Sequence, residues 1–170
     1  MSFKLRILYL HGKNSSSGGR KPEYLRQSGY HVTCPDLPSL IGNVSDVFNP
    51  CLELVIKCIR KNDHDIIVAS SFGAGIAMSL INTGLWSGRA LLLSQAGYKY
   101  GMQTLNTTSP ILLIHGLMDT ITPIEGSRSI RNANPNFIQL VELNDDHALK
   151  SLLKDNLLSK YIDQLMSSPL

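Results

Sequence analysis

Short apolar runs alternate with longer amphipathic segments along the chain, and this alternation limits the folds that are open to it. The apolar runs are residues 5–10, 30–34, 65–69, 90–93, 111–114 and 137–143. Most of them are continuously apolar, which is typical of strands covered on both faces. Helices are expected at 20–28, 49–61, 72–83, 123–132 and 147–166. The pattern predicts an α/β fold with a doubly wound, six-stranded, mostly parallel sheet and helices on both faces.

Two of the expected helices have well-marked features. Asn49 is placed to cap the second helix, and Pro50 then occupies its first turn, where a missing N–H costs nothing. In the last segment, apolar residues recur at the spacing of a helical turn from Leu149 to Leu165. A single helix is therefore expected over 147–166.

The size and charge of the chain exclude several classes of function. Its 170 residues, 43% of them hydrophobic, are expected to form one domain over residues 1–170 with a sizeable core. No apolar stretch reaches the roughly 18 residues that a membrane-spanning helix needs, so no membrane association is expected. The net charge is +3 and the basic residues are scattered, which does not favour nucleic acid as a partner.

The cysteines and histidines predict neither a metal nor a cofactor. Cys34, Cys51 and Cys58 are odd in number and lack the spacing of metal ligands. No two histidines lie three or four residues apart on an expected helix. Unpaired cysteines favour a reducing compartment, so a cytoplasmic location is predicted. Protein partners are not indicated by any motif.

Residues 69–73, Ala-Ser-Ser-Phe-Gly, lie between the third apolar run and a helix-like segment. A serine with small residues two positions before and after it, here Ala69 and Gly73 around Ser71, is typical of a sharp strand-to-helix turn that exposes the serine. In doubly wound sheets ligands bind beyond the carboxyl ends of the strands, where Ser71 is expected to lie. The alternative is an ordinary turn in which Ser70 or Ser71 caps the helix.

The first apolar run is followed by a turn rich in Gly and Ser, residues 11–19. Its Gly-Lys pair lacks the flanking residues of a phosphate-binding loop. We interpret the segment as a turn whose backbone N–H groups face the site, since Gly12 allows a close approach and the N–H of Lys13 is free to donate to an oxyanion. A second donor is expected at Phe72, the first residue of the helix after Ser71. The alternative for residues 11–19 is a solvated linker.

An aspartate and a histidine follow the fifth and sixth runs. Thr122 is the better cap for the helix that Pro123 is expected to open, so Asp119 is left for another role. His147 is expected at a helix N-terminus, where the helix dipole disfavours a charged imidazole. This argues against a purely structural role as a cation.

The partner of His147 is not decided by the sequence. Asp119 is one choice and Asp145 or Asp146 another, although the latter two lie too near in sequence for good imidazole geometry. His11 and His115 precede glycines at strand ends and are expected to brace loops rather than to take part in chemistry.

Together these segments resemble the α/β-hydrolase superfamily. Residues 8–12, Leu-Tyr-Leu-His-Gly, look like its oxyanion strand and loop, 115–123 like its acid loop, and 146–147 like its histidine loop. The resemblance covers nearly the whole chain. It implies Ser71 as nucleophile, His147 as base and Asp119 as the acid that orients it. It also implies the backbone N–H groups of Phe72 and Lys13 as oxyanion donors, and no cofactor.

Departures from the family pattern point to a minimal member. Ala69 stands where the first glycine of the motif usually lies, and only residues 94–109 separate the fourth and fifth runs, too few for a helical lid. The chain is thus similar to small lidless serine esterases, including bacterial esterases and retinoblastoma-binding-protein-9-like hydrolases. The resemblance implies hydrolysis of small acyl esters or thioesters through an acyl-enzyme.

Two alternatives to an esterase stay open at this point. One is an amidase or peptidase of the same fold, and the other is a hydrolase-like interaction module without significant turnover. Tyr98 and Tyr100, after the fourth run, either line a shallow acyl pocket or lie on the surface.

Overall fold

The computed structural model describes residues 5–38 and 44–169, so residues 1–4, 39–43 and 170 of the expected domain lie outside the described residues. The strands are β1 (Arg6–Leu10), β2 (His31–Thr33), β3 (Ile66–Ser70), β4 (Arg89–Leu93), β5 (Ile111–Gly116) and β6 (Ile138–Leu143). The α-helices are α1 (Arg20–Gln27), α2 (Val44–Lys61), α3 (Phe72–Asn82), α4 (Glu125–Ala133) and α5 (Leu157–Ser167). Two short 3₁₀ helices are η1 (Gly97–Tyr100) and η2 (Lys150–Leu153).

The six strands form one sheet in the order β2-β1-β3-β4-β5-β6, and every neighbouring pair is parallel. The doubly wound parallel sheet predicted from the apolar runs is confirmed. The strand order changes direction between β1 and β3, so the chain leaves these two strands in opposite directions. Such a switch point opens a crevice at the carboxyl ends of the strands.

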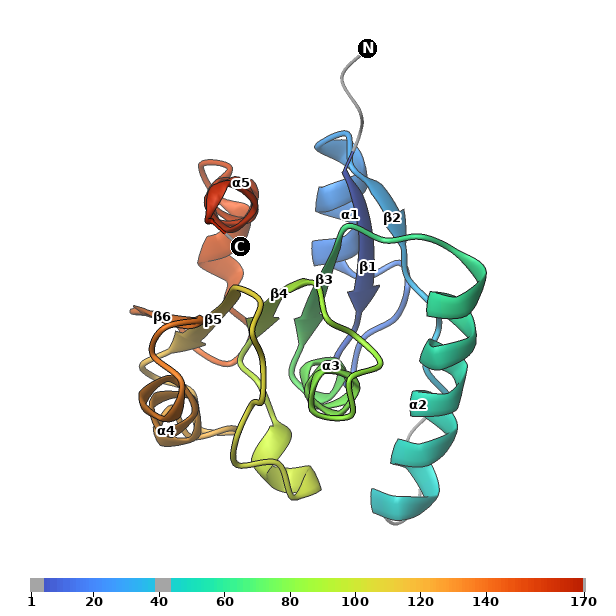
Figure 1. The fold of residues 1–170 in the computed structure, drawn as a ribbon. Coiled ribbons are helices and arrows are strands. Elements are labelled where there is room, and N and C mark those ends of the chain that lie inside the picture. Colours follow the sequence, from blue (N-terminus) through green and yellow to red (C-terminus); the bar gives the residue numbers. More distant parts are fainter. Residues whose placement is uncertain (1–4, 39–43, 170) are drawn as a thin grey trace.

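Helices cover the sheet on both faces, as expected (Figure 1). On one face α2, α3 and α4 pack on side chains such as Leu8, Ile67 and Leu92. On the other face α1 and α5 pack on the intervening residues, such as Ile7 and Val68. The strand side chains of both layers are almost fully buried, which explains why the central strands read as continuous apolar runs.

The second helix begins earlier than its sequence indicates. The structure places Pro50 inside α2, so the expected cap at Asn49 is wrong. Proline removes one backbone hydrogen bond and is costly inside a helix. The turn before it is nevertheless helical because Phe48 packs on the rings of Phe72 and Tyr100, with centroid distances of 6.0 and 4.9 Å. Tertiary packing here outweighs the local preference.

The last expected helix is divided in two. Residues 150–153 form η2, and α5 begins only at Leu157. Between them Asp155 and Asn156 have φ angles of 52° and 56°, in the left-handed region that Asp and Asn tolerate better than most residues. The single helix predicted over 147–166 is therefore wrong, although Leu149 and Leu165, the ends of the apolar series, are both buried as that series predicts.

The turn from β3 into α3 brings the helix unusually close to the end of β1. A Cβ atom at Gly73 would lie 2.2 Å from the carbonyl oxygen of Leu10 and 2.7 Å from that of His11. No other residue fits there without moving the backbone. The helix N-terminus, with Ser71 directly before it, is thereby held against the loop that follows β1.

The first prediction concerns this contact. Gly73→Ala should lower the free energy of unfolding by about 3 kcal/mol or more, because the added methyl group meets rigid backbone rather than a side chain that can rotate. Chemical denaturation followed by circular dichroism measures the loss. In Gly18→Ala, the matched control, the new Cβ is 3.9 Å from its nearest neighbour, so little change is expected. Equal stabilities of the two variants would contradict the prediction.

Candidate active site

Ser71 occupies the turn between β3 and α3 in a strained backbone conformation. Its φ and ψ angles are 51° and −111°, outside the regions that a serine ordinarily adopts. The N–H of Ser71 donates to the carbonyl oxygen of Leu93 at 2.8 Å, which holds the turn to β4. Ser71 is the N-cap residue of α3, yet its side chain makes no capping hydrogen bond. The alternative of an ordinary capping serine is therefore not what the structure shows.

The structure brings Ser71, His147 and Asp119 together from three separate loops. The Nε2 atom of His147 lies 2.9 Å from Oγ of Ser71, and its Nδ1 atom lies 2.7 Å from Oδ2 of Asp119. Because a carboxylate only accepts, Nδ1 carries the proton and Nε2 is free to accept from the serine hydroxyl. Asp145 and Asp146 hydrogen bond to the backbone of their own loop, so Asp119 is the aspartate that contacts His147.

The carboxylate of Asp119 is fully buried and accepts several hydrogen bonds. Its Oδ1 accepts from the backbone N–H groups of Ile121 and Thr122, each at 2.9 Å. Its Oδ2 accepts from the Thr122 hydroxyl at 2.8 Å in addition to His147. Burial alone raises the pKa of this carboxyl group, but the hydrogen bonds outweigh burial and lower the pKa to about 2.

Thr122 has a different role from the one expected. The structure starts α4 at Glu125 with Ile124 as its N-cap, so Thr122 does not cap the helix and Pro123 does not open it. Instead Thr122 is buried, and its hydroxyl also lies 3.1 Å from Nδ1 of His147. The turn 119–122 thus folds back on the carboxylate of Asp119. In the sequence Thr122 stands out only as a polar residue next to a proline, so this role is not indicated there.

Behind Asp119 lies a buried chain of hydrogen bonds. His115 donates from Nε2 to the carbonyl oxygen of Thr122 at 2.7 Å, and the same nitrogen lies 3.1 Å from Oδ2 of Asp119. Ser127 donates to Nδ1 of His115 at 2.8 Å and accepts from the Gln95 amide at 3.1 Å. The expectation that His115 braces a loop is confirmed, but Gln95 and Ser127 carry no sequence signal of this network.

His11 braces a loop as well. Its Nε2 atom accepts the N–H of Leu37 at 3.0 Å, and Nδ1 donates to the carbonyl oxygen of Gly12 at 2.8 Å. These bonds tie the turn after β1 to the segment after β2. They help to fix the position of the neighbouring Lys13.

The loop that carries His147 lies directly against the end of β5. A Cβ atom at Gly116 would lie 2.3 and 2.6 Å from the carbonyl oxygens of Asp145 and Asp146. On the other side of the loop, the Lys21 ammonium donates to the carbonyl oxygen of Ala148. Contacts on both sides therefore hold the imidazole in reach of Ser71.

Lys13 and Phe72 line an open cavity of about 520 Å³ together with Ser71 and His147, which we call the Ser71 cavity. The N–H of Phe72 belongs to the first turn of α3, where N–H groups have no acceptor within the helix. Both predicted oxyanion donors thus border the space next to the serine hydroxyl. Their role in stabilising an oxyanion stays a prediction.

Comparison with solved structures identifies the architecture. A proposed hydrolase of the alpha/beta superfamily from Xanthomonas campestris pv. campestris matches with a TM-score of 0.77 at 17% identity, over 96% of this chain and 98% of that one. Est1E from Butyrivibrio proteoclasticus matches with a TM-score of 0.71 at 16% identity, over 97% and 89% of the two chains. The chain has the α/β-hydrolase fold.

A third match with this fold is a monoacylglycerol lipase from Paleococcus ferrophilus, with a TM-score of 0.73 at 14% identity over 96% of this chain and 95% of that one. No protein-family model and no curated protein matches the chain by sequence. At identities this low the likeness shows the fold alone.

The segment between β4 and β5 lies wholly within the described residues, and its one helical element is the short 3₁₀ helix η1. As expected for a small α/β-hydrolase fold, this segment forms no helical lid over the site.

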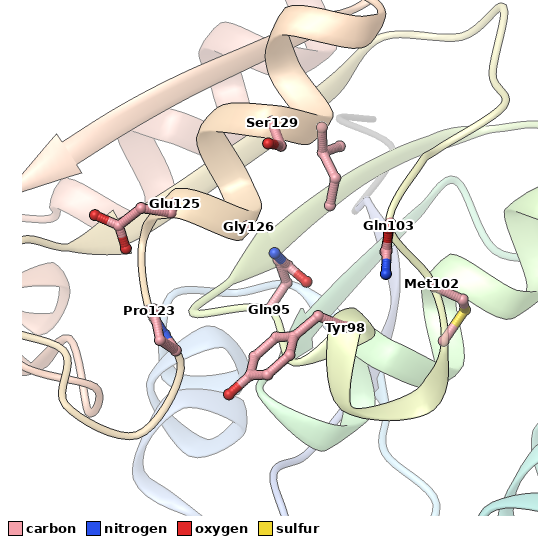
Figure 2. A pocket seen from close by; sticks show the side chains of 9 residues that line it. Gln95, Tyr98, Met102, Gln103, Pro123, Glu125, Gly126 and Ser129 are labelled. Carbon is pink, nitrogen blue, oxygen red and sulfur yellow. The ribbon is translucent and has the colours of Figure 1, made fainter.

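Beside the Ser71 cavity lies a second hollow of about 310 Å³, which we call the side pocket. Figure 2 shows the amide of Gln95 and the ring of Tyr98 at its centre, with Pro123 and Glu125 along one edge. The Tyr98 hydroxyl donates to the carbonyl oxygen of Ile121 at 3.4 Å. Tyr98 lines the side pocket, whereas Tyr100 lines the Ser71 cavity.

The remaining expectations concern cofactors and membranes. Within the described residues, no group of three or more His, Cys, Asp or Glu side chains is arranged to hold a metal ion. Cys34, Cys51 and Cys58 are free thiols. No helix in residues 5–38 and 44–169 combines the length and apolar character needed to cross a bilayer.

The second prediction follows from the lowered pKa of Asp119. An unfolded chain protonates this aspartate near its ordinary pKa of about 3.9, whereas the folded chain protonates it only near 2. The carboxylate therefore stabilises the fold fully above about pH 4, and this contribution of about 2 kcal/mol is lost as the pH falls toward 2. Urea denaturation across this range measures it.

Asp119→Asn should lack this part of the pH dependence. The control is Asp155→Asn, which changes an exposed aspartate in the left-handed turn before α5 and should keep the pH dependence of the unmodified protein. A parallel loss of stability in the unmodified protein and in Asp119→Asn between pH 4 and 2 would contradict the assignment.

Proposed function

We propose that the protein is a serine hydrolase that cleaves short acyl esters or thioesters through a covalent acyl-enzyme. The observation that carries the proposal is the unbroken chain of hydrogen bonds from Ser71 through His147 to Asp119, with distances of 2.9 and 2.7 Å. This arrangement suits the activation of a serine hydroxyl by a neutral imidazole. Two proteins that share the fold, the proposed alpha/beta-superfamily hydrolase from Xanthomonas campestris pv. campestris and the monoacylglycerol lipase from Paleococcus ferrophilus, are in keeping with a hydrolase.

The proposed reaction begins when Oγ of Ser71 attacks the carbonyl carbon of the substrate. Nε2 of His147 takes the serine proton, and the buried carboxylate of Asp119 stabilises the imidazolium that forms. The same proton then passes to the leaving alkoxide or thiolate as the bond to it breaks. Water, deprotonated by His147, attacks the acyl-enzyme, and return of the proton to Ser71 releases the acid.

The developing oxyanion is proposed to lie between the N–H groups of Phe72 and Lys13. Removal of one such donor commonly reduces kcat by about two to three orders of magnitude. Both donors belong to the backbone, so the close approach that Gly73 permits between α3 and the end of β1 sets the distance between them.

The proposed substrates are small because the cavity is open and of limited volume. Tyr100, Ile121 and Leu153 are among its apolar lining residues, and none of the described residues forms a lid over them that would enclose a long chain. The same imidazolium of His147 would also have to protonate the leaving amine of an amide or peptide bond, which is a poorer leaving group than an alkoxide or a thiolate. Esters and thioesters are therefore the preferred class.

The third prediction tests the nucleophile. A fluorophosphonate probe should label the protein stoichiometrically, and Ser71→Ala should abolish labelling and lower kcat/KM for para-nitrophenyl butyrate by at least about a thousandfold. Mass spectrometry of the labelled peptide locates the site. Ser70→Ala is the matched control, because it removes the adjacent hydroxyl, which contacts Tyr9 instead, and should retain labelling. A folded protein without labelling or turnover would favour an interaction module.

The fourth prediction tests whether the Thr122 hydroxyl supports the carboxylate of Asp119. Thr122→Val keeps the shape of the side chain but removes the hydroxyl that donates to Asp119 at 2.8 Å. Hydrogen bonds to charged groups contribute about 1.5–3 kcal/mol, so kcat/KM on a neutral ester should fall about tenfold or more. Thr120→Val, at an exposed position of the same loop, should leave the rate unchanged. Equal rates for the two variants would contradict a role for Thr122.

A further inference from the structure

The Ser71 cavity is lined by side chains of one charge sign. Five of its lining residues are basic, and none is an aspartate or a glutamate. They are Lys13, Arg20, Lys21, Lys99 and Lys150. The whole chain has 16 basic and 13 acidic residues, so the one-sided lining does not follow from composition.

Four of these cations line the cavity from three separate segments. Lys13 and Arg20 come from the turn after β1 and the start of α1, Lys99 from η1 after β4, and Lys150 from η2 after β6. All four side chains are exposed, and among the described residues none of them lies within 4.0 Å of a carboxylate oxygen. They are therefore available to a ligand.

The fifth cation, Lys21, has a structural partner. Its ammonium donates to the carbonyl oxygen of Ala148, and the charges of Asp145 and Asp146 act on it. Burial lowers the pKa of Lys21 against these charges. We therefore assign Lys21 to the support of the His147 loop and not to the ligand.

The side pocket provides an internal comparison. It lies next to the same site, yet its lining contains Glu125 and no lysine or arginine (Figure 2). The cations thus gather at the hollow that contains Ser71 and not at the side pocket. Field lines from cations around a concave site concentrate within it and raise the local concentration of anions.

We propose that the substrate of the Ser71 cavity is an ester or thioester that carries an anionic group, a carboxylate or a phosphate. This inference rests on the proposed hydrolase function and specifies its substrate class. The reacting carbonyl lies at Ser71, and the anionic group lies toward Lys99 and Lys150 or toward Lys13 and Arg20. Whether the anionic group belongs to the acid portion or to the leaving group of the substrate depends on which of these cations it contacts.

The expected preference is moderate and depends on salt. Each exposed ion pair contributes little free energy in water. Several cations around one cavity together should raise kcat/KM for an anionic substrate about tenfold over a neutral one at low ionic strength. The preference should shrink toward unity near 1 M salt, where charges are screened over about 3 Å.

The fifth prediction is tested with two matched pairs of substrates. The mono-para-nitrophenyl ester of adipic acid and para-nitrophenyl hexanoate have acyl chains of equal length and differ in a terminal carboxylate. S-butyryl-phosphopantetheine and S-butyryl-pantetheine differ in a phosphate on the leaving group. For at least one pair, kcat/KM should be about tenfold higher for the anionic member, and the pair identifies which portion carries the charge.

Variants assign the preference to the cavity. Lys99→Gln combined with Lys150→Gln removes the cations that follow β4 and β6, and Lys13→Gln combined with Arg20→Gln removes the two cations at the connection from β1 to α1. One of these double variants should reduce the ratio between anionic and neutral substrates to about two or three. Lys57→Gln is the control, because it removes a positive charge from an exposed site on α2 and should leave the ratio unchanged.

The outcomes separate this inference from the proposed function. Ser71-dependent hydrolysis with equal kcat/KM within both pairs would overturn the anionic substrate and leave the hydrolase in place. A preference that Lys57→Gln reduces as much as the cavity variants would also overturn it, because it would then reflect net charge. Absence of Ser71-dependent turnover with all four substrates would overturn both.

Discussion

The close packing of α3 against the end of β1 is the contact on which the site depends. Only a residue without a side chain fits at Gly73, where a Cβ atom would lie 2.2 Å from the carbonyl oxygen of Leu10. The helix therefore starts at the very edge of the sheet, and the preceding residue, Ser71, takes a positive φ angle. The same contact places the free N–H of Phe72 beside the turn that contains Lys13. The proposed nucleophile and the proposed oxyanion donors thus share one structural cause.

Asp119 gives the site its second fixed point. Its carboxylate is fully buried, and the hydrogen bonds from the 119–122 turn and from His147 keep it ionised. A buried charge is tolerated only when such partners are present. Behind it, His115 links the turn to Ser127 on α4 and so to the body of the domain. The position of the proposed base is therefore set by β5, α4 and the last loop together.

Much of this architecture is readable from local patterns. Six apolar runs specify six strands because both faces of a parallel sheet are covered, and the three candidate site residues stand out because each follows a run at the carboxyl edge of the sheet. The start of α2 before Pro50 and the break at Asp155 and Asn156 are not readable in the same way. At the start of α2, packing of Phe48 on two rings distant in sequence outweighs the cost of the proline. Before α5, the apolar residues keep a helical spacing through 155–156, so their pattern gives no sign of the turn there. Local preference is decisive only where long-range contacts do not oppose it.

The amino-acid sequence by itself determined the fold class and the candidates Ser71, Asp119 and His147, because periodicity and turn chemistry act over a few residues. Only the tertiary structure decided which aspartate contacts the imidazole, that Thr122 serves the carboxylate rather than a helix, and that cations from three separate segments surround one cavity. The physical reason is that hydrogen bonds and electrostatic fields depend on distances through space. Those distances exist only after the strands have been ordered and packed.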